Sequence, residues 1–323
     1  MRFMKLDSGG CVYGAGVLLK HLQALEKEFA GVSEGRGDIE YIHRMRVATR
    51  RLRAALPLFA ACLPKKRYPA WEKSIRAVTR ALGVARDADV QIQHLEAFRR
   101  EQNNRLWSPG LNRLVLRLRQ KRARLQPGLA KALEELRASG AAAEMRALLA
   151  PLAARAEGVP LYTPVLYEHA RAAVCERLDE ILAFDAIVDQ PEKMAELHAM
   201  RIAAKRLRYT LEIFAPLYPG ELKDWFQAAR DAQDDLGEIH DCDVWAEFIP
   251  RFLEKERERV LAYLGHTRPF PRLALGVEAY AAARAVSRAE TYAAFTKKWA
   301  RWKEKEIWER LRQAVQPSAP AED

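Results

Sequence analysis

The chain has 323 residues, of which 49% are hydrophobic and 30% are charged. This composition excludes a disordered basic tail and allows a large buried core. The formal net charge of +11 indicates a polyanionic partner, such as nucleic acid, an anionic membrane or a phosphate chain.

Four cysteines are spaced irregularly and form no CxxC pair: Cys11, Cys62, Cys175 and Cys242. This pattern is typical of a reducing cytoplasm and disfavours a structural zinc site. Cys62 and Cys175 fall on apolar helix faces, so we expect them to be packing residues. No apolar run reaches the ~20 residues of a membrane-spanning helix, and the N-terminus does not resemble a signal peptide.

Helical periodicity accounts for nearly the whole chain, which predicts an all-α fold. Glycines, prolines and serines divide it into helices of about 18 to 30 residues, a length typical of bundles. Gly83 and Gly237 are among the expected breaks.

The first charged helix is predicted within residues 42–64. Its apolar stripe consists of Met45, Ala48, Thr49, Leu52, Leu56 and Phe59. The opposite face carries the cations and a histidine: His43, Arg46, Arg50 and Arg53, with Arg51 to one side. No acid interrupts this face, although like charges one turn apart repel by a few tenths of a kcal/mol. We therefore expect an anion site with guanidinium groups aimed at phosphate oxygens. A solvent-facing basic helix is the simpler alternative.

Residues 197–219 repeat this pattern 155 residues later. The repeated basic face consists of His198, Arg201, Lys205 and Arg208, with Arg206 to one side. The apolar face consists of Met200, Leu207, Leu211 and Phe214. Because the two copies match position by position, the anion-site interpretation is favoured. Protonation of the histidines beside phosphate would make binding tighter near pH 6 than near pH 8.

A second repeat indicates that the duplication extends along the chain. Residues 71–90 align with residues 225–244, and this alignment places Arg86 opposite His240. We expect two halves, residues 1–158 and 159–316, and a disordered tail at residues 317–323.

Two further segments are basic, within residues 111–125 and 295–311. Their cations recur at helical spacing: Arg113, Arg117 and Lys121, then Lys297, Lys298 and Arg301. The alternative is that leucines or tryptophans form a core face there while the cations are solvated.

The repeated HxMRVAxRRLRxxLxxF pattern, followed by LGxxRDxDV, resembles the CHAD domain, the conserved histidine α-helical domain. The resemblance extends from about residue 17 to residue 315. It implies two pseudo-symmetric antiparallel helical bundles with a basic cavity between them. It also implies binding of inorganic polyphosphate, with residence on polyphosphate granules in the cytoplasm. Many relatives carry a triphosphate-tunnel domain ahead of this region, but the chain lacks an ExExK-type opening, so we expect a stand-alone domain.

On this interpretation, the duplicated helices supply the polyphosphate-binding residues. These are His43, Arg46, Arg50, Arg51, Arg53, His198, Arg201, Lys205, Arg206 and Arg208. Arg86, His240 and the six cations of the two further basic segments are additional candidates.

Two other functions remain open. Interleaved lysines and tryptophans after residue 295 would suit binding of single-stranded nucleic acid. The pair His240-Asp241 would suit a metal-dependent phosphohydrolase, but the surrounding cations would repel a metal. We expect Asp87, Asp89, Asp241 and Asp243 to brace arginines or cap helices instead. We therefore predict no catalytic residue, metal or cofactor, and the oligomeric state is left open.

Overall fold

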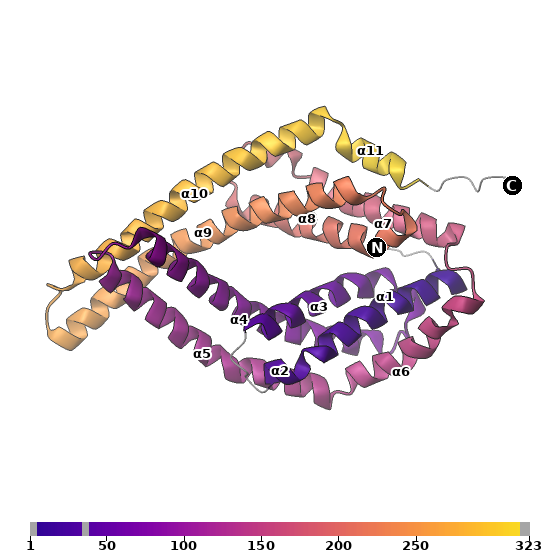
Figure 1. Ribbon diagram of the computed structural model, residues 1–323, viewed down its shortest axis with the longest axis horizontal. Helices are drawn as coiled ribbons and strands as arrows, with labels where there is room; N and C mark the ends of the chain where they lie inside the picture. The colour runs from indigo at the N-terminus through magenta and orange to yellow at the C-terminus, as the bar shows by residue number, and fades with distance from the viewer. Residues whose placement is uncertain (1–4, 34–38, 317–323) are drawn as a thin grey trace.

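The computed structural model describes residues 5–33 and 39–316, and this part of the chain contains helices and no strands (Figure 1). The predicted all-α class is confirmed. No described helix is long and apolar enough to cross a membrane. The tail predicted to be disordered, residues 317–323, lies outside the described residues.

The main helices in chain order are α1 (Ser8–Lys27), α2 (Phe29–Ser33), α3 (Ile39–Leu58), α4 (Tyr68–Gln102), α5 (Ser108–Ala138), α6 (Ala141–Ala153), α7 (Pro164–Leu182), α8 (Met194–Phe214), α9 (Lys223–Leu264), α10 (Phe270–Glu304) and α11 (Ile307–Ala314). Short 3-10 turns interrupt them at Ala60–Cys62, Ala154–Gly158, Asp185–Ile187 and Ala215–Leu217.

The helix ends follow local sequence signals. The Asp7 side chain caps α1 by accepting a hydrogen bond from the Gly10 backbone N–H at 2.8 Å. Thr163 caps α7 in the same way, and Pro164 occupies the first turn of that helix. Gly265 ends α9 with φ of 73°, a left-handed conformation that glycine adopts without steric cost.

Two long antiparallel hairpins meet at one end of the molecule. Helix α4 packs against α5, α9 packs against α10, and α10 also packs against α5 (Figure 1, left). At the other end, α1, α3 and α6 pack together and α7 packs on α8. Helices α3 and α8, which carry the duplicated motif, contact each other.

The hydrophobic core extends across both sequence halves. Tyr13 stacks on Phe214 with ring centroids 6.5 Å apart, and Phe59 meets Phe214 edge-on at 6.1 Å. The His169 Nε2 donates a hydrogen bond to the Leu58 carbonyl oxygen at 2.8 Å. Residues before and after position 158 therefore share one core. The duplication and its boundary stay predictions.

A smaller core lies where the two hairpins meet. It consists of Leu95, Leu111, Leu114, Val115, Leu118, Trp245, Ile249, Phe252, Val277 and Tyr280. Beside it, the buried Arg284 of α10 donates to Glu238 at 2.7 Å and lies 3.0 Å from the Nε2 atom of His94 on α4. This polar network links the first half of the chain to the second.

Gly83 and Gly237 do not end helices, so that prediction is wrong. Helix α4 passes through Gly83 and α9 passes through Gly237, which makes these helices 35 and 42 residues long. An interior glycine costs a helix only about 1 kcal/mol, and packing along both hairpins outweighs that cost. A Cβ atom at Gly237 would lie 3.4 Å from the Arg201 Nε, an ordinary van der Waals contact, so the surroundings do not require glycine at this position.

The expectation that Cys62 is a packing residue is also wrong. Cys62 forms a disulfide with Cys11, although 51 residues separate them. Helix α1 lies against α3, and this packing brings the two thiols together. Because this disulfide is present, the irregular spacing of the cysteines no longer supports a reducing compartment. Cys175 and Cys242 are free.

Candidate functional site

Helices α3 and α8 orient the duplicated motif as the sequence predicts. The apolar positions on both helices are buried: Met45, Ala48, Thr49, Leu52, Leu56, Phe59, Met200, Leu207, Leu211 and Phe214. The basic positions on the opposite faces are less buried, and all of them except the exposed Arg206 are only partly accessible. Because one face of each helix is buried in the core, the cations of that helix lie on its opposite face.

The contact between α3 and α8 brings cations from the two motifs together. A pocket of about 460 Å³ lies there. It is lined by Arg50, Arg53, Ala54, Pro57, Leu58, Glu72, Arg76, Arg177, Ile202, Lys205, Arg206, Tyr209 and Thr210. Six of these residues are cationic and Glu72 is the acid among them, so the lining carries a positive excess.

Burial and neighbouring positive charges both act on the ammonium of Lys205 in this pocket. Burial, followed by the charges of Arg50 and Arg201, lowers the pKa of Lys205 to about 8. Burial also lowers the pKa of Arg50, with further contributions from neighbouring arginines. An ammonium or guanidinium loses affinity for its proton where positive charge is in excess. An anion placed here would restore that affinity.

Tyr209 provides an aromatic surface beneath two of the arginines. The Arg50 and Arg208 guanidinium carbons lie 5.6 Å and 4.5 Å from its ring centroid. These cation–π contacts orient planar guanidinium groups without neutralising them. Arg50 therefore keeps its full charge for a ligand.

A pair of histidines lies on α8 and α9, outside the residues that line the pocket. The rings of His198 on α8 and His240 on α9 are 4.0 Å apart between centroids. Burial lowers the pKa of both, and further lowering comes from His240 acting on His198 and from Arg201 acting on His240. Within the described chain, the buried His198 Nδ1 and Arg201 Nε atoms have no hydrogen-bond partner. Two polar atoms on this face are thus left unsatisfied.

His43, the matching histidine on α3, has a different neighbour. Burial, and then the charge of Arg86, lowers its pKa. The sequence alignment places Arg86 opposite His240, so the α3 histidine faces a cation where the α8 histidine faces a second imidazole.

Acids on α7 and α8 reach several of the predicted cations. Arg51 pairs with Glu212 at 2.6 Å, and Arg208 approaches the same carboxylate at 3.9 Å. Arg206 pairs with Glu180 at 3.4 Å. The flanking Arg51 and Arg206 thus each form an ion pair within the protein, and their predicted role in polyphosphate binding stays a prediction.

Comparisons with known proteins place this fold. The sequence matches the CHAD domain family over residues 16–250. The chain belongs to the CHAD domain family. No curated protein matches the sequence.

Two solved structures resemble this CHAD chain. The crystal structure of the CHAD domain from the plant Ricinus communis is 24% identical with a TM-score of 0.65, covering 92% of this chain and 94% of that chain. PptA from Streptomyces chartreusis is 18% identical with a TM-score of 0.55, covering 89% and 98%. At these identities the likeness supports the fold alone.

The secondary basic segments of this CHAD chain do not line the α3/α8 pocket. Arg113 and Arg117 contact Glu256, and Lys121 lies over the Phe248 ring at 5.9 Å. Lys298 donates to Asp235 at 2.7 Å. Lys297 and Arg301 are exposed on α10.

The tryptophans near the C-terminus form part of the core, as the alternative interpretation of that segment predicts. Trp299 and Trp308 are buried, and the half-buried Trp302 contacts both rings. They offer no exposed row of ring faces for stacking on bases.

Three of the four aspartates in the second repeat pair with arginines, as expected. Asp87 accepts from Arg46 at 3.2 Å, Asp89 accepts from Arg122 at 2.8 Å, and Asp243 accepts from Arg288. Within the described residues, no group of three or more His, Cys, Asp and Glu side chains could hold a metal ion.

Sequence reasoning missed Arg76 of α4 and Arg177 of α7, which both line the pocket. Each pairs with an acid on its own helix: Arg76 with Glu72 at 2.5 Å, and Arg177 with Glu180. On a single helix such a pair is typical of a solvated face. Only the packing of four helices reveals that these side chains face α3 and α8.

Proposed function

We propose that this chain binds inorganic polyphosphate through the basic faces of α3 and α8. The observation that carries the proposal is the pocket between α3 and α8, whose lining contains six cations and one acid. Burial, together with the neighbouring positive charges, lowers the pKa of Lys205 there. A flexible chain of phosphates supplies negative charge without a base to stack. The CHAD resemblance implies the same ligand.

Arginine geometry suits this ligand. Guanidinium groups contact phosphate oxygens in bidentate fashion, and release of counterions adds a salt-dependent gain in entropy. The pocket collects side chains from four helices, so a bound chain would meet cations on several sides. We propose binding without catalysis, and absence of orthophosphate release with Mg²⁺ or Mn²⁺ would agree with that.

A salt series of binding to phosphate chains of defined length tests the proposal. We expect Arg50→Ala/Lys205→Ala to lower affinity at least about tenfold, and to reduce the slope of log K against log salt by about one per lost contact. Lys131→Ala/Arg137→Ala is the matched control, because it removes two exposed cations of α5 that each pair with an acid of the same helix. An equal loss in the control would refute a localised site.

Competition separates this ligand from nucleic acid. We expect long-chain polyphosphate to resist displacement by single-stranded RNA at equal charge concentration. Association with polyphosphate granules in cells is part of the same proposal. It predicts that a fluorescent fusion loses its granule signal when Arg50 and Lys205 are both replaced by alanine.

A further inference from the structure

A second cationic pocket lies between α5 and α9, in the region where the two long hairpins meet. Its volume of about 380 Å³ falls within the range of small-molecule sites. It is lined by Arg117, Leu118, Gln120, Lys121, Arg124, Phe248, Arg251, Phe252, Lys255 and Arg259. No residue of this lining belongs to the α3/α8 pocket, so the two sites are distinct.

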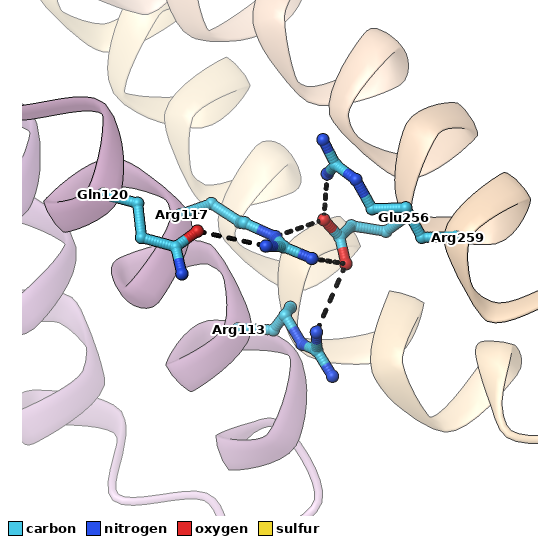
Figure 2. Close-up of polar contacts among 5 residues, drawn as sticks. All are labelled: Arg113, Arg117, Gln120, Glu256 and Arg259. Carbon is cyan, nitrogen blue, oxygen red and sulfur yellow. Dashed lines mark hydrogen bonds and ion pairs between the residues drawn. The ribbon is translucent and has the colours of Figure 1, made fainter. Parts of the chain in front are cut away.

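A buried carboxylate organises the guanidinium groups at this pocket (Figure 2). Glu256, with its side chain 1% exposed, accepts from Arg117 Nε at 2.7 Å and also pairs with Arg259. Arg113 approaches it at 3.7 Å. Burial raises the pKa of the Glu256 carboxyl, but the hydrogen bonds from the two arginines outweigh burial and lower it overall. The ionised carboxylate thus holds Arg117 and Arg259 in fixed positions.

Glu256, together with Glu247, which pairs with Arg251 at 3.8 Å, cannot balance the charge of this pocket, whose lining contains six cations. Gln120 fixes the other side of Arg117 by accepting a hydrogen bond at 3.0 Å. Across the described residues, Arg124 and Lys255 have no carboxylate within ion-pair distance, and both are exposed. A multiply charged anion complements this arrangement.

The wall of the pocket is apolar, unlike that of a simple phosphate site. Leu118 and Phe252 are buried beneath it, and the half-buried Phe248 presents its ring. In the free protein, Lys121 covers that ring at 5.9 Å. A bare phosphate chain gains nothing from such a wall, whereas an aromatic group would gain apolar contact and stacking.

We propose that the α5/α9 pocket binds a free nucleoside polyphosphate. The base packs on Phe248 and takes the place of the Lys121 ammonium. The phosphates lie among Lys121, Arg124 and Lys255. Arg117, which Glu256 holds in position, is a further phosphate contact. The pocket volume of about 380 Å³ matches a small-molecule site, so we assign a single nucleotide to it and not a strand. This inference does not depend on polyphosphate binding at α3 and α8.

Calorimetric titration at fixed salt tests the assignment with ATP, inorganic tripolyphosphate and adenosine as probes. We expect ATP to bind more tightly than either part alone. Phe248→Leu keeps the apolar volume but removes the ring, so ATP affinity should fall roughly tenfold while tripolyphosphate affinity stays unchanged. Lys255→Ala should weaken both phosphate ligands. Thermal melting of each variant checks that it folds.

Control measurements separate the two pockets. In Arg50→Ala/Lys205→Ala, ATP binding should persist, and Phe248→Leu should still weaken it. The inference is overturned if tripolyphosphate binds as tightly as ATP in the Arg50→Ala/Lys205→Ala background, if Phe248→Leu leaves ATP affinity unchanged, or if ATP binding disappears in the α3/α8 double variant. Tighter binding of oligoadenylate than of ATP, at equal phosphate concentration, would overturn the choice of a free nucleotide.

Discussion

The guanidinium of Arg117 on α5 and the buried carboxylate of Glu256 on α9 are joined by two hydrogen bonds, at 2.7 Å and 3.5 Å (Figure 2). Residues 139 positions apart are thereby linked across the meeting point of the two hairpins. A bidentate contact of this kind fixes orientation as well as distance.

Replacement of Glu256 by glutamine should destabilise the protein. It leaves Arg117 and Arg259 without their shared charge partner, although both arginines still reach water. We expect a loss of about 1–3 kcal/mol in the free energy of unfolding. Chemical denaturation measures it, with the exposed Glu258→Gln on the same helix as control. Equal stability of the two variants would contradict a structural role for the buried ion pair.

Binding of polyphosphate should weaken as pH rises from 7 to 9. The pKa of Lys205 is lowered to about 8 in the free protein, so the side chain loses its charge in this window, and a bound polyanion favours the protonated form. The expected change is several-fold, on the order of 1 kcal/mol. Lys205→Arg keeps its positive charge between pH 7 and pH 9 and should abolish this step in affinity. A step of the same size in that variant would exclude Lys205 as its source.

The three histidines should strengthen polyphosphate binding only at a pH below their ordinary pKa. His43, His198 and His240 all have lowered pKa values, so in the free protein they remain mainly neutral at pH 6.5. Without ligand, stability is lost as pH falls below 6.5, because the unfolded chain binds protons more readily. A polyanion offsets this cost, so affinity should rise further between pH 6.5 and 5. Affinity measured across this range should rise less in His198→Asn/His240→Asn, and an equal rise would contradict their involvement.

Removal of the Cys11–Cys62 bond should lower stability. The bond closes a loop across a sequence separation of 51 residues, for which chain entropy gives up to about 4 kcal/mol. Cys11→Ser/Cys62→Ser should therefore melt at a lower temperature under oxidising conditions. Cys175→Ser, at a free and partly buried cysteine, is the control. If dithiothreitol leaves the melting temperature of the unmodified protein unchanged, the bond contributes nothing.

Close packing of α5 against α10 should depend on glycine. A Cβ atom at Gly276 would lie 2.1 Å from the Trp107 carbonyl oxygen, and one at Gly110 would lie 2.1 Å from that of Leu273. We expect Gly276→Ala to destabilise the protein by at least about 1–3 kcal/mol through forced displacement of the backbone. Gly83→Ala meets open space inside α4 and should stabilise by about 0.5–1 kcal/mol. If denaturation shows that both substitutions change the free energy of unfolding in the same direction, this account is contradicted.

The sequence by itself determined the helical class and the orientation of α3 and α8. Helical periodicity is a local property, so the spacing of Met45, Leu52 and Leu56 was enough to predict which face is buried and which carries His43 and Arg46. The HxMR pattern also led to the CHAD family, which the comparison confirms. Polyphosphate binding by this face stays a prediction.

Only the tertiary structure decided which charges face one another. Glu212 reaches Arg51, Glu180 reaches Arg206, and Cys62 reaches Cys11, each through contacts between different helices. The same packing carried α4 and α9 through their glycines and separated Arg117 from the α3/α8 pocket. Helix periodicity is set within a few residues, whereas ion pairs, disulfides and pockets depend on distances between segments that lie far apart in the chain. That is why the sequence predicted the faces and the tertiary structure determined their partners.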